Sequence, residues 1–198
     1  MVKLGILVLA GGDSKRLGMK KAFLEINGKP MIQHVVEKVS KLSGEIVISC
    51  RSSREKLVRM FPKAIVVADK NRKKGALTGL VSALPEINSE YTALVSCDSP
   101  KVEPKVIRYL FEIAKTHGGA VPRWPNGYVE PLQAVYKTEE LRRAVDELWA
   151  VGSMKLLYVI KKIPDIVYVP TKKLRKIDPK LESFINLNSP ADIKFLKT

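Results

Sequence analysis

Glycines and cations follow the first apolar run of the sequence. A glycine has no side chain, so the backbone there can approach a ligand closely and present its N–H groups. The glycines are Gly11, Gly12 and Gly18, and the cations among them are Lys15, Arg16, Lys20 and Lys21. N–H groups and cations together bind anions such as phosphates. The segment therefore predicts a phosphate-binding loop, although a glycine-rich turn with lysines on the surface would have the same composition.

The spacing separates this loop from two common phosphate-binding motifs. Five residues stand between Gly12 and Gly18, and no Gly-Lys-Ser/Thr follows them, so the loop is not a Walker A loop. The G-x-G-x-x-G spacing of dinucleotide-binding loops is also missing. The sequence therefore indicates a phosphate loop of another kind.

A carboxylate stands at the end of a later apolar run, where Asp98 precedes Ser99 and Pro100. A proline disfavours the helical conformation of the residue before it. We therefore expect the chain to stay extended past Asp98, with the carboxylate projecting from the carboxyl edge of a sheet. Mg²⁺ takes one or two carboxylates and completes its shell with substrate phosphates and water. Beside a phosphate loop, Asp98 predicts a magnesium site; in isolation it would only cap a turn.

Apolar runs alternate with segments of helical spacing along most of the chain. The runs predict strands near residues 4–9, 45–50, 64–68, 91–96, 118–122, 132–136 and 166–169. Helices are predicted near residues 32–39, 54–60, 77–84, 104–114 and 141–149, and Ser189-Pro190 is a typical helix start. This alternation predicts an α/β fold with a mostly parallel sheet flanked by helices. Ligands on such sheets bind beyond the carboxyl ends of the strands, which is where the glycine loop and Asp98 stand.

Length and composition narrow the class of protein. The 198 residues are 45% hydrophobic and 28% charged, which excludes disordered and collagen-like chains and predicts a single domain over residues 1–198. No apolar run approaches the roughly 20 residues that span a bilayer. No secretory signal supports a disulfide, so Cys50 and Cys97 are expected to be reduced and buried, and the protein cytoplasmic.

The net charge of +15 attracts anions, which include nucleic acids, acidic membrane surfaces and phosphorylated small molecules. The cations are spread in pairs along the chain, and no long basic tail is present. A clustered basic helix or an aromatic stacking platform, which nucleic-acid-binding modules use, is absent from the sequence pattern. Phosphorylated small molecules are therefore the expected partners, without nucleic acid or membrane.

Residues 9–30 resemble the signature of the nucleotidyltransferases that activate sugars and cofactors. The matching residues are Ala10, Gly11, Gly12, Arg16, Gly18, Lys21 and Gly28-Lys29-Pro30. Within that superfamily, the Leu-Ala-Gly-Gly of residues 9–12 is most similar to molybdenum cofactor guanylyltransferases, whereas relatives that use CTP more often carry Leu-Ala-Ala-Gly. Lys20 stands where the family usually has an aspartate.

Further segments resemble the same family and extend over nearly the whole chain. They are residues 69–79, 95–100, 130–136 and 184–192. Two positions depart from the family pattern. Ala76 replaces a proline. Cys50 stands where the family places an asparagine near the nucleotide, and a thiol lacks the donor and acceptor pair of the asparagine amide.

The resemblance implies a role for each matching residue. It implies catalysis by Arg16, Lys21 and Asp98, with Mg²⁺ on Asp98. It implies GTP binding by Leu9, Ala10, Gly11, Gly12, Lys21, Asp69 and Asp98. Acceptor contacts are expected from Arg123, Gln133, Asn186 and Asn188, with Trp124 and Glu130 beside them. Asn186 and Asn188 are expected to alternate on a strand and so share one face, although they could instead organise the turn before Ser189.

The implied fold is a Rossmann-like domain of the nucleotide-diphospho-sugar transferase type. Residues 1–100 would form a nucleotide-binding half and residues 101–198 an acceptor-binding half. The implied activity transfers GMP from GTP to the terminal phosphate of molybdopterin or its metal-loaded form, with molybdoenzyme-maturation proteins as further partners. The alternatives are CTP with molybdopterin, GTP with a cobinamide or sugar phosphate, a GTP-binding regulator without turnover, and a nucleic-acid-binding module.

Overall fold

A single mixed sheet organises the molecule. The computed structural model describes residues 2–11, 21–70, 75–153, 155–187 and 192. In that part of the chain seven strands follow the order β5-β4-β1-β6-β8-β7-β9. Their bounds are β1 (Leu4–Leu9), β4 (Ile46–Cys50), β5 (Ile65–Ala68), β6 (Tyr91–Ser96), β7 (Gly119–Arg123), β8 (Gln133–Lys137) and β9 (Ile166–Pro170). A separate antiparallel pair joins β2 (Glu25–Ile26) to β3 (Lys29–Pro30).

Strand β1 lies at the centre of the parallel part of the sheet. It pairs in parallel with β4 on one side and with β6 on the other, and Leu9 is level with both Ser49 and Ser96. The carboxyl ends of three strands therefore meet at one place. Strand β8 is antiparallel to both β6 and β7, so the sheet is mostly parallel, as expected.

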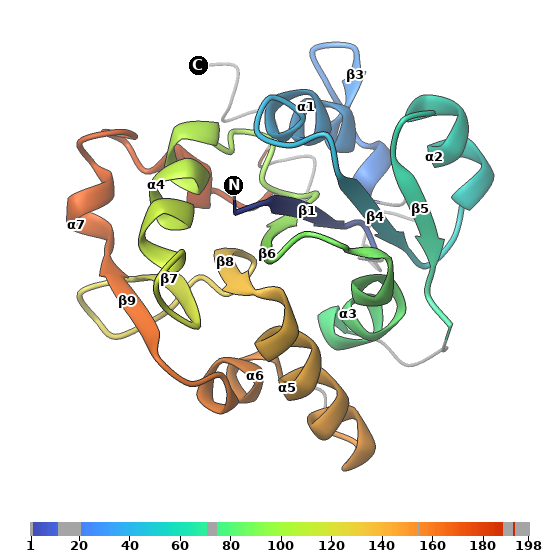
Figure 1. Ribbon diagram of the computed structural model, residues 1–198. Helices are drawn as coiled ribbons and strands as arrows, with labels where there is room; N and C mark the ends of the chain where they lie inside the picture. Colours follow the sequence, from blue (N-terminus) through green and yellow to red (C-terminus); the bar gives the residue numbers. More distant parts are fainter. Residues whose placement is uncertain (1, 12–20, 71–74, 154, 188–191, 193–198) are drawn as a thin grey trace.

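Helices cover both faces of the sheet (Figure 1). Their bounds are α1 (Met31–Val39), α2 (Arg54–Met60), α3 (Ala76–Ala83), α4 (Pro104–Ala114), α5 (Thr138–Ala150), α6 (Leu156–Lys162) and α7 (Thr171–Leu174), with 3-10 turns η1 (Lys21–Phe23), η2 (Leu84–Glu86) and η3 (Glu182–Phe184). Helices α1, α2 and α4 pack on one face, and α3, α5 and α6 pack on the other. Each face thus has its own apolar core, because successive strand residues point to opposite sides.

The predicted strands and helices are confirmed to within a few residues, but short elements were missed. The β2–β3 pair has two residues per strand, too few for a periodic pattern to show. Helix α6 comes from the run Leu156-Leu157-Tyr158-Val159-Ile160, whose unbroken apolar character hides the helical period. The helix start predicted at Ser189-Pro190 lies outside the described residues.

The two cysteines are free and buried, as expected. Cys50 ends β4 and Cys97 follows β6. Burial raises the pKa of the Cys97 thiol to about 12, so this cysteine is neutral and acts as a small apolar side chain. In the part of the chain that the structure describes, no helix is both long and apolar enough to cross a membrane.

Glu45 links the amino end of β4 to the segment that precedes β6. Its two carboxylate oxygens accept hydrogen bonds from the backbone N–H groups of Asn88 (2.7 Å) and Ser89 (2.9 Å). Burial raises the pKa of Glu45, but the hydrogen bonds from Ser89 and Asn88 outweigh it and hold the pKa below its ordinary value. The charged form of Glu45 is therefore the one that stabilises the fold.

We predict that Glu45→Gln lowers the free energy of unfolding by about 1–2 kcal/mol at pH 7, because a charged acceptor of two N–H bonds is lost. Since the folded pKa is depressed, this contribution is present above the unfolded pKa of about 4.3 and fades as the pH falls through the folded pKa. Urea unfolding of both proteins between pH 3 and pH 7 tests this. The exposed Glu55 of α2 provides the control Glu55→Gln, and equal losses in the two variants would contradict the prediction.

Candidate active site

The carboxyl ends of β4, β1 and β6 lie at the point of the sheet where the order of successive strands changes direction. The chain runs outward from β1 through β4 to β5 and then returns to place β6 on the other side of β1. Open α/β sheets bind ligands at such a switch point. The Ala10 N–H donates to the Ser49 carbonyl (2.8 Å), and the Cys97 N–H donates to the Leu9 carbonyl (3.1 Å). The start of the glycine loop is thus fixed to both neighbouring strands.

Lys21 and Asp98 meet at this edge although 76 residues stand between them in sequence. The Lys21 Nζ lies 3.3 Å from Asp98 Oδ2, and the two side chains are 17% and 19% exposed. The Ser96 hydroxyl donates to the other carboxylate oxygen, Oδ1, at 2.5 Å. The pair joins η1, after the glycine loop, to the end of β6. Gly12 and Arg16, also predicted to bind phosphate, lie outside the described residues.

The chain turns directly after Asp98, so the extended path predicted from Pro100 is wrong. The Ser99 N–H donates to the Ser96 carbonyl (3.3 Å), and the Val102 N–H donates to the Ser99 carbonyl (3.0 Å). Ser99 ends the first turn and begins the second, in which Pro100 takes the second position that proline favours. The carboxylate nevertheless stands at the carboxyl edge of β6, as predicted.

The segment after η3 closes over this turn. The Leu187 N–H donates to the Asp98 carbonyl (2.9 Å), and the Ser99 hydroxyl donates to Asn186 Oδ1 (2.6 Å). Residues 185–187 are irregular, so the prediction that Asn186 lies on a strand is wrong; the backbone there bonds to a turn instead of a neighbouring strand. Asn188 lies outside the described residues. Asn186 is nevertheless brought close to the turn that carries Asp98.

Asp69 lies against the glycine loop from the opposite side. It follows β5, and its Oδ1 accepts a hydrogen bond from the buried Ser49 hydroxyl (2.7 Å). Its other oxygen, Oδ2, would lie 3.1 Å from a Cβ placed on Gly11. Ser49 and Ser96 were not predicted from the sequence to belong to the site. Each is a polar residue at the end of an apolar strand, and that position is the signal that could have revealed them.

The predicted acceptor residues fall into two groups. Gln133 begins β8 opposite Val95, one strand from Asp98, and is 3% exposed. In the described structure neither amide atom of Gln133 has a hydrogen-bond partner. Arg123 is different: its guanidinium lies over the Tyr168 ring, 5.6 Å from the centroid, on the outermost strand. The structure therefore brings Gln133 toward the site and does not bring Arg123 there.

Trp124 and Glu130 form a small polar and aromatic cluster near the end of β7. The Trp124 Nε1 donates to Glu130 Oε1 (2.7 Å), and the Trp124 ring meets Phe184 edge to face. Burial raises the pKa of Glu130, while the bond from Trp124 acts in the opposite direction. Since Phe184 precedes Asn186 by two residues, this cluster borders the segment that covers Asp98.

The side chains at this edge that could ligate a metal decide whether a magnesium ion fits. No group of three or more His, Cys, Asp or Glu side chains suited to a metal occurs among residues whose positions the structure gives. Asp98 offers one carboxylate at the edge of β6, beside Lys21. Mg²⁺ takes one or two carboxylates when substrate phosphates and water supply the other ligands. The residues present fit a magnesium ion that arrives with a phosphate chain.

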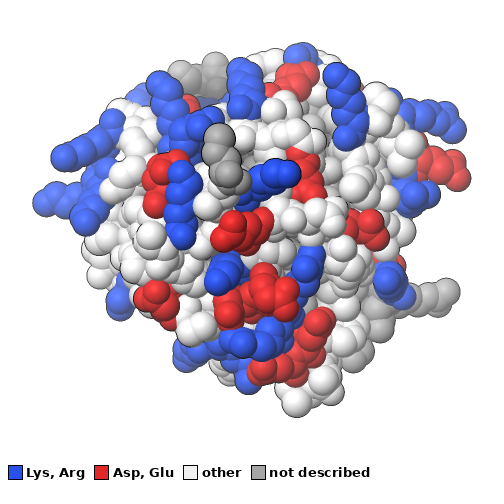
Figure 2. All heavy atoms as spheres, viewed as in Figure 1, with Lys and Arg blue, Asp and Glu red and all other residues white. Residues whose placement is uncertain are grey.

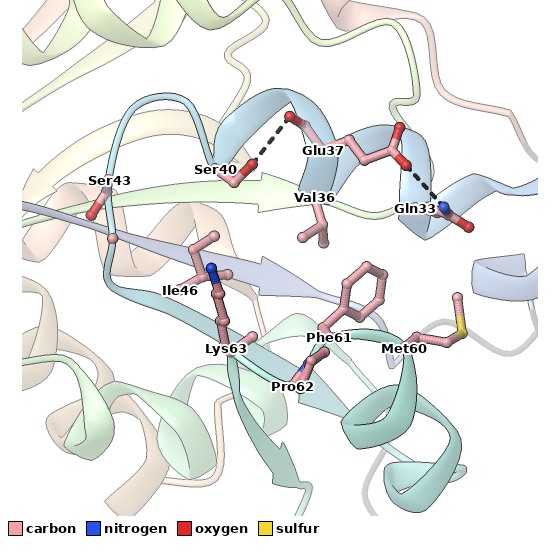
Figure 3. A pocket seen from close by; sticks show the side chains of 12 residues that line it. Gln33, Val36, Glu37, Ser40, Ser43, Ile46, Met60, Phe61, Pro62 and Lys63 are labelled. Atoms are coloured by element: carbon pink, nitrogen blue, oxygen red, sulfur yellow. Dashed lines mark hydrogen bonds between the residues drawn. The ribbon is translucent and has the colours of Figure 1, made fainter.

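A groove of about 490 Å³ lies elsewhere on the molecule (Figure 3). It is formed by the outer side of α1 and the segment that leads into β5, with Val36, Ile46 and Phe61 among its apolar walls. Ile46 begins β4, so this groove stands at the amino ends of the strands. It contains none of the predicted site residues.

Comparison with known proteins agrees with this geometry. Residues 6–164 match the family model of the MobA-like NTP transferase domain. The chain belongs to the MobA-like NTP transferase family. As a member of this family it is a nucleotidyltransferase.

Curated relatives of this MobA-like chain share one protein name. A protein of Pyrococcus horikoshii is 36% identical over 98% of this chain and 100% of its own length. A protein of Methanosarcina mazei is 31% identical over 95% of this chain and 87% of its own length. Each is named a probable molybdenum cofactor guanylyltransferase. The resemblance inferred from the motifs is confirmed.

Solved structures share the architecture of this MobA-like transferase. A crystal structure of molybdopterin-guanine dinucleotide biosynthesis protein A from Archaeoglobus fulgidus is 31% identical and superposes with a TM-score of 0.81, covering 96% of this chain and 95% of that chain. A cytidylyltransferase from Thermus thermophilus, 16% identical with a TM-score of 0.70 and coverage of 96% and 95%, shows the same fold alone. The predicted nucleotidyltransferase fold is confirmed.

We predict that Gly79→Ala destabilises the protein and disturbs Asp69. An alanine in a helix is normally better than glycine by about 1 kcal/mol. Here the new Cβ would lie 2.6 Å from Ser49 Oγ and 3.0 Å from Leu9 Cδ2, so the buried Ser49 must rotate away from Asp69. Overpacking of this kind costs about 1–3 kcal/mol, which exceeds the gain.

Thermal unfolding and nucleotide affinity measure the effect of Gly79→Ala. A Cβ on Gly44 meets nothing within 4 Å, so Gly44→Ala is the matched control. We expect a lower Tm and weaker GTP binding in Gly79→Ala alone. A Tm at or above that of the unaltered protein would show that the contact between α3 and β4 is not constrained in this way.

Proposed function

We propose that this chain transfers GMP from GTP to the terminal phosphate of molybdopterin, with or without its metal, and releases pyrophosphate. The observation that carries the proposal is the meeting of Lys21 and Asp98, 3.3 Å apart, at the carboxyl edge beside the glycine loop. The names of the curated relatives support guanosine as the nucleoside and molybdopterin as the acceptor.

The nucleotide would lie across the end of β1. Asp69 follows β5 and Asp98 follows β6, which are three strand spacings apart, or about 14 Å. In our proposal the triphosphate occupies the loop side, where Gly11 and Gly12, with Arg16 and Lys21, meet its oxygens. Leu9 and Ala10 border the nucleotide, and the Ala10 N–H stays bonded to the Ser49 carbonyl. Asp69 then faces the nucleoside, where a carboxylate accepts from base or ribose donors. Ser49 holds Asp69 in that orientation.

The reaction is a displacement at phosphorus. An oxygen of the acceptor phosphate attacks the α-phosphorus of GTP, the bond from that phosphorus to the β-bridging oxygen breaks, and pyrophosphate carries away the electron pair. No general base is required, because a phosphate monoester is already ionised near neutral pH. The protein aligns the two phosphates and neutralises charge with Lys21 and Arg16.

Asp98 is the residue that would hold Mg²⁺. When bound, the ion neutralises charge on the phosphate oxygens and orients them. Lys21 stands at the same carboxylate and so balances its charge before substrates arrive. The Ser96 hydroxyl donates to the other oxygen of Asp98 and helps to orient the carboxylate.

The acceptor would enter from the half formed by residues 101–198, opposite the nucleotide half formed by residues 1–100. We assign its contacts to Gln133, Asn186 and Asn188, with Trp124 and Glu130 nearby. Asn186 and Gln133 both lie next to the turn or strand that carries Asp98. Arg123 was predicted for this role as well, but its guanidinium lies over the Tyr168 ring, so we do not assign it an acceptor contact here.

We predict that Asp98→Asn lowers the rate of guanylyl transfer by at least about a hundredfold while the fold survives, since an amide cannot supply the anionic oxygen that a metal needs. Pyrophosphate release measures turnover, and circular dichroism checks the fold. The exposed Asp146 of α5 provides the control Asp146→Asn. A near-normal magnesium-dependent rate in Asp98→Asn would remove Asp98 from the metal site.

A substrate panel tests the proposed function itself. Each of the four nucleoside triphosphates is offered with molybdopterin, a cobinamide phosphate or a sugar phosphate, and pyrophosphate release is followed with Mg²⁺ present. We expect turnover only with GTP and molybdopterin or its metal-loaded form. Turnover with CTP, or with another acceptor, would replace this proposal by a related nucleotidyl transfer. GTP binding without release under every combination would favour a regulator.

A further inference from the structure

A second groove lies at the outer end of the sheet. It has a volume of about 370 Å³ and is formed by the end of β7, the edge strand β9 and helix α6. Val129 and Ile160 give it aliphatic walls, and Leu157 stands at its rim, 48% exposed. The groove is therefore an apolar depression that opens to solvent beside an unshared edge of the sheet.

Exposed aromatic side chains gather around this groove. Tyr158 and Tyr168 line it and are 42% and 41% exposed, and Tyr128 nearby is 61% exposed. Together with Leu157, they make up four of the nine large hydrophobic residues that the described chain exposes. Apolar side chains that gather on a surface in this way mark an interaction site.

Cations lie on these aromatic rings. The Arg123 guanidinium lies 5.6 Å from the Tyr168 centroid, and the ammonium groups of Lys155 and Lys161 lie 5.5 and 5.9 Å from the Tyr158 centroid. The groove lining includes Arg123 and Lys161 and, among the residues that the structure describes, no aspartate or glutamate. Tyrosine and arginine around an aliphatic centre are typical of the energetically important part of a protein interface.

We propose that this groove docks an acidic segment of a partner protein. The segment inserts an aliphatic side chain between Leu157 and Tyr168, and its flanking carboxylates meet Arg123 and Lys161. The charges of the lining select an acidic partner, because like charges placed opposite one another are unfavourable. A second copy of this chain, with its net charge of +15, is therefore a poor occupant.

The shape and chemistry of the groove favour protein over nucleic acid. Single-stranded nucleic acids bind by stacking bases on open aromatic faces. Here Tyr158 and Tyr168 each have a cation over the ring, and the walls between them are aliphatic. On the face shown in Figure 2, cations and acids are interspersed rather than gathered in one basic stripe. An aliphatic side chain with acidic neighbours fits this surface.

The groove is separate from the candidate active site. Strand β8 lies between β7 and β6, so the end of β7 stands about 10 Å, or two strand spacings, from the end of β6. Lys21, Asp69 and Asp98 do not line the groove. A docked segment therefore leaves the nucleotide edge open, and this inference stands whether or not the proposed reaction is right.

Binding of designed peptides to the full chain tests the inference. The probe is a fluorescein-labelled peptide of six glutamates with two leucines at its centre, and the control peptide carries serines in place of the leucines. Fluorescence anisotropy at about 150 mM salt measures both, since surface charge pairs weaken at this ionic strength. We expect the leucine peptide to bind at least about tenfold more tightly than the serine peptide.

Three variants locate the binding. Lys161→Glu reverses a charge in the groove, and Lys63→Glu makes the same change at an exposed lysine near β5. We expect Lys161→Glu to weaken the leucine peptide about tenfold or more and Lys63→Glu to have little effect. Leu157→Ser removes an exposed apolar contact and should weaken the leucine peptide but not the serine peptide. Thermal unfolding checks that each variant folds.

Three results would overturn the docking site: equal binding of both peptides, equal losses from Lys161→Glu and Lys63→Glu, or tighter binding of an eight-nucleotide oligothymidylate that also depends on Lys161. Guanylyl transfer by Lys161→Glu is measured in parallel and is expected to be unchanged. Loss of peptide binding with intact transfer supports the inference, whereas absence of transfer in the unaltered protein bears only on the proposed function.

Discussion

The parallel pairing of β1 with β4 and β6 is the constraint on which the site depends. It sets Leu9, Ser49 and Ser96 level, so that whatever follows each strand emerges at one edge. The loop after β1 is then held by the Ser49 carbonyl, and Ser96 reaches Asp98 within two residues. A slip of one residue in either pairing would turn the polar ends of these strands to the opposite face of the sheet. The register of these strands, more than any single side chain, brings the predicted site residues to one edge.

Much of this arrangement could be predicted from the sequence because the decisive signals are local. The apolar runs locate the strands, and the rule that ligands bind at carboxyl ends brings the glycine loop, Asp69 and Asp98 together before any coordinates are known. The meeting of Lys21 with Asp98 follows from the same rule, since one residue stands after the loop and the other after a neighbouring strand.

What could not be predicted depends on tertiary hydrogen bonds. The irregular path at Asn186 and its closure over the turn that carries Asp98 are set by contacts between segments far apart in the sequence, which local preferences do not include. Ser49 gains its role only because β5 brings Asp69 beside it. The direction of Arg123 is likewise decided by β9, which pairs with β7 across a long stretch of chain.

The bond from the Leu187 N–H to the Asp98 carbonyl has a consequence for the order in which the protein matures. Leu187 stands near the end of the sequence, whereas β1 and β6 are both complete by residue 96. Contacts between residues far apart in the chain carry the largest entropic cost of loop closure. During synthesis, a ribosome-bound chain can thus already hold its central parallel strands while its acidic turn remains uncovered. The covering of the turn at Asp98 thus requires a segment that is synthesised well after β6.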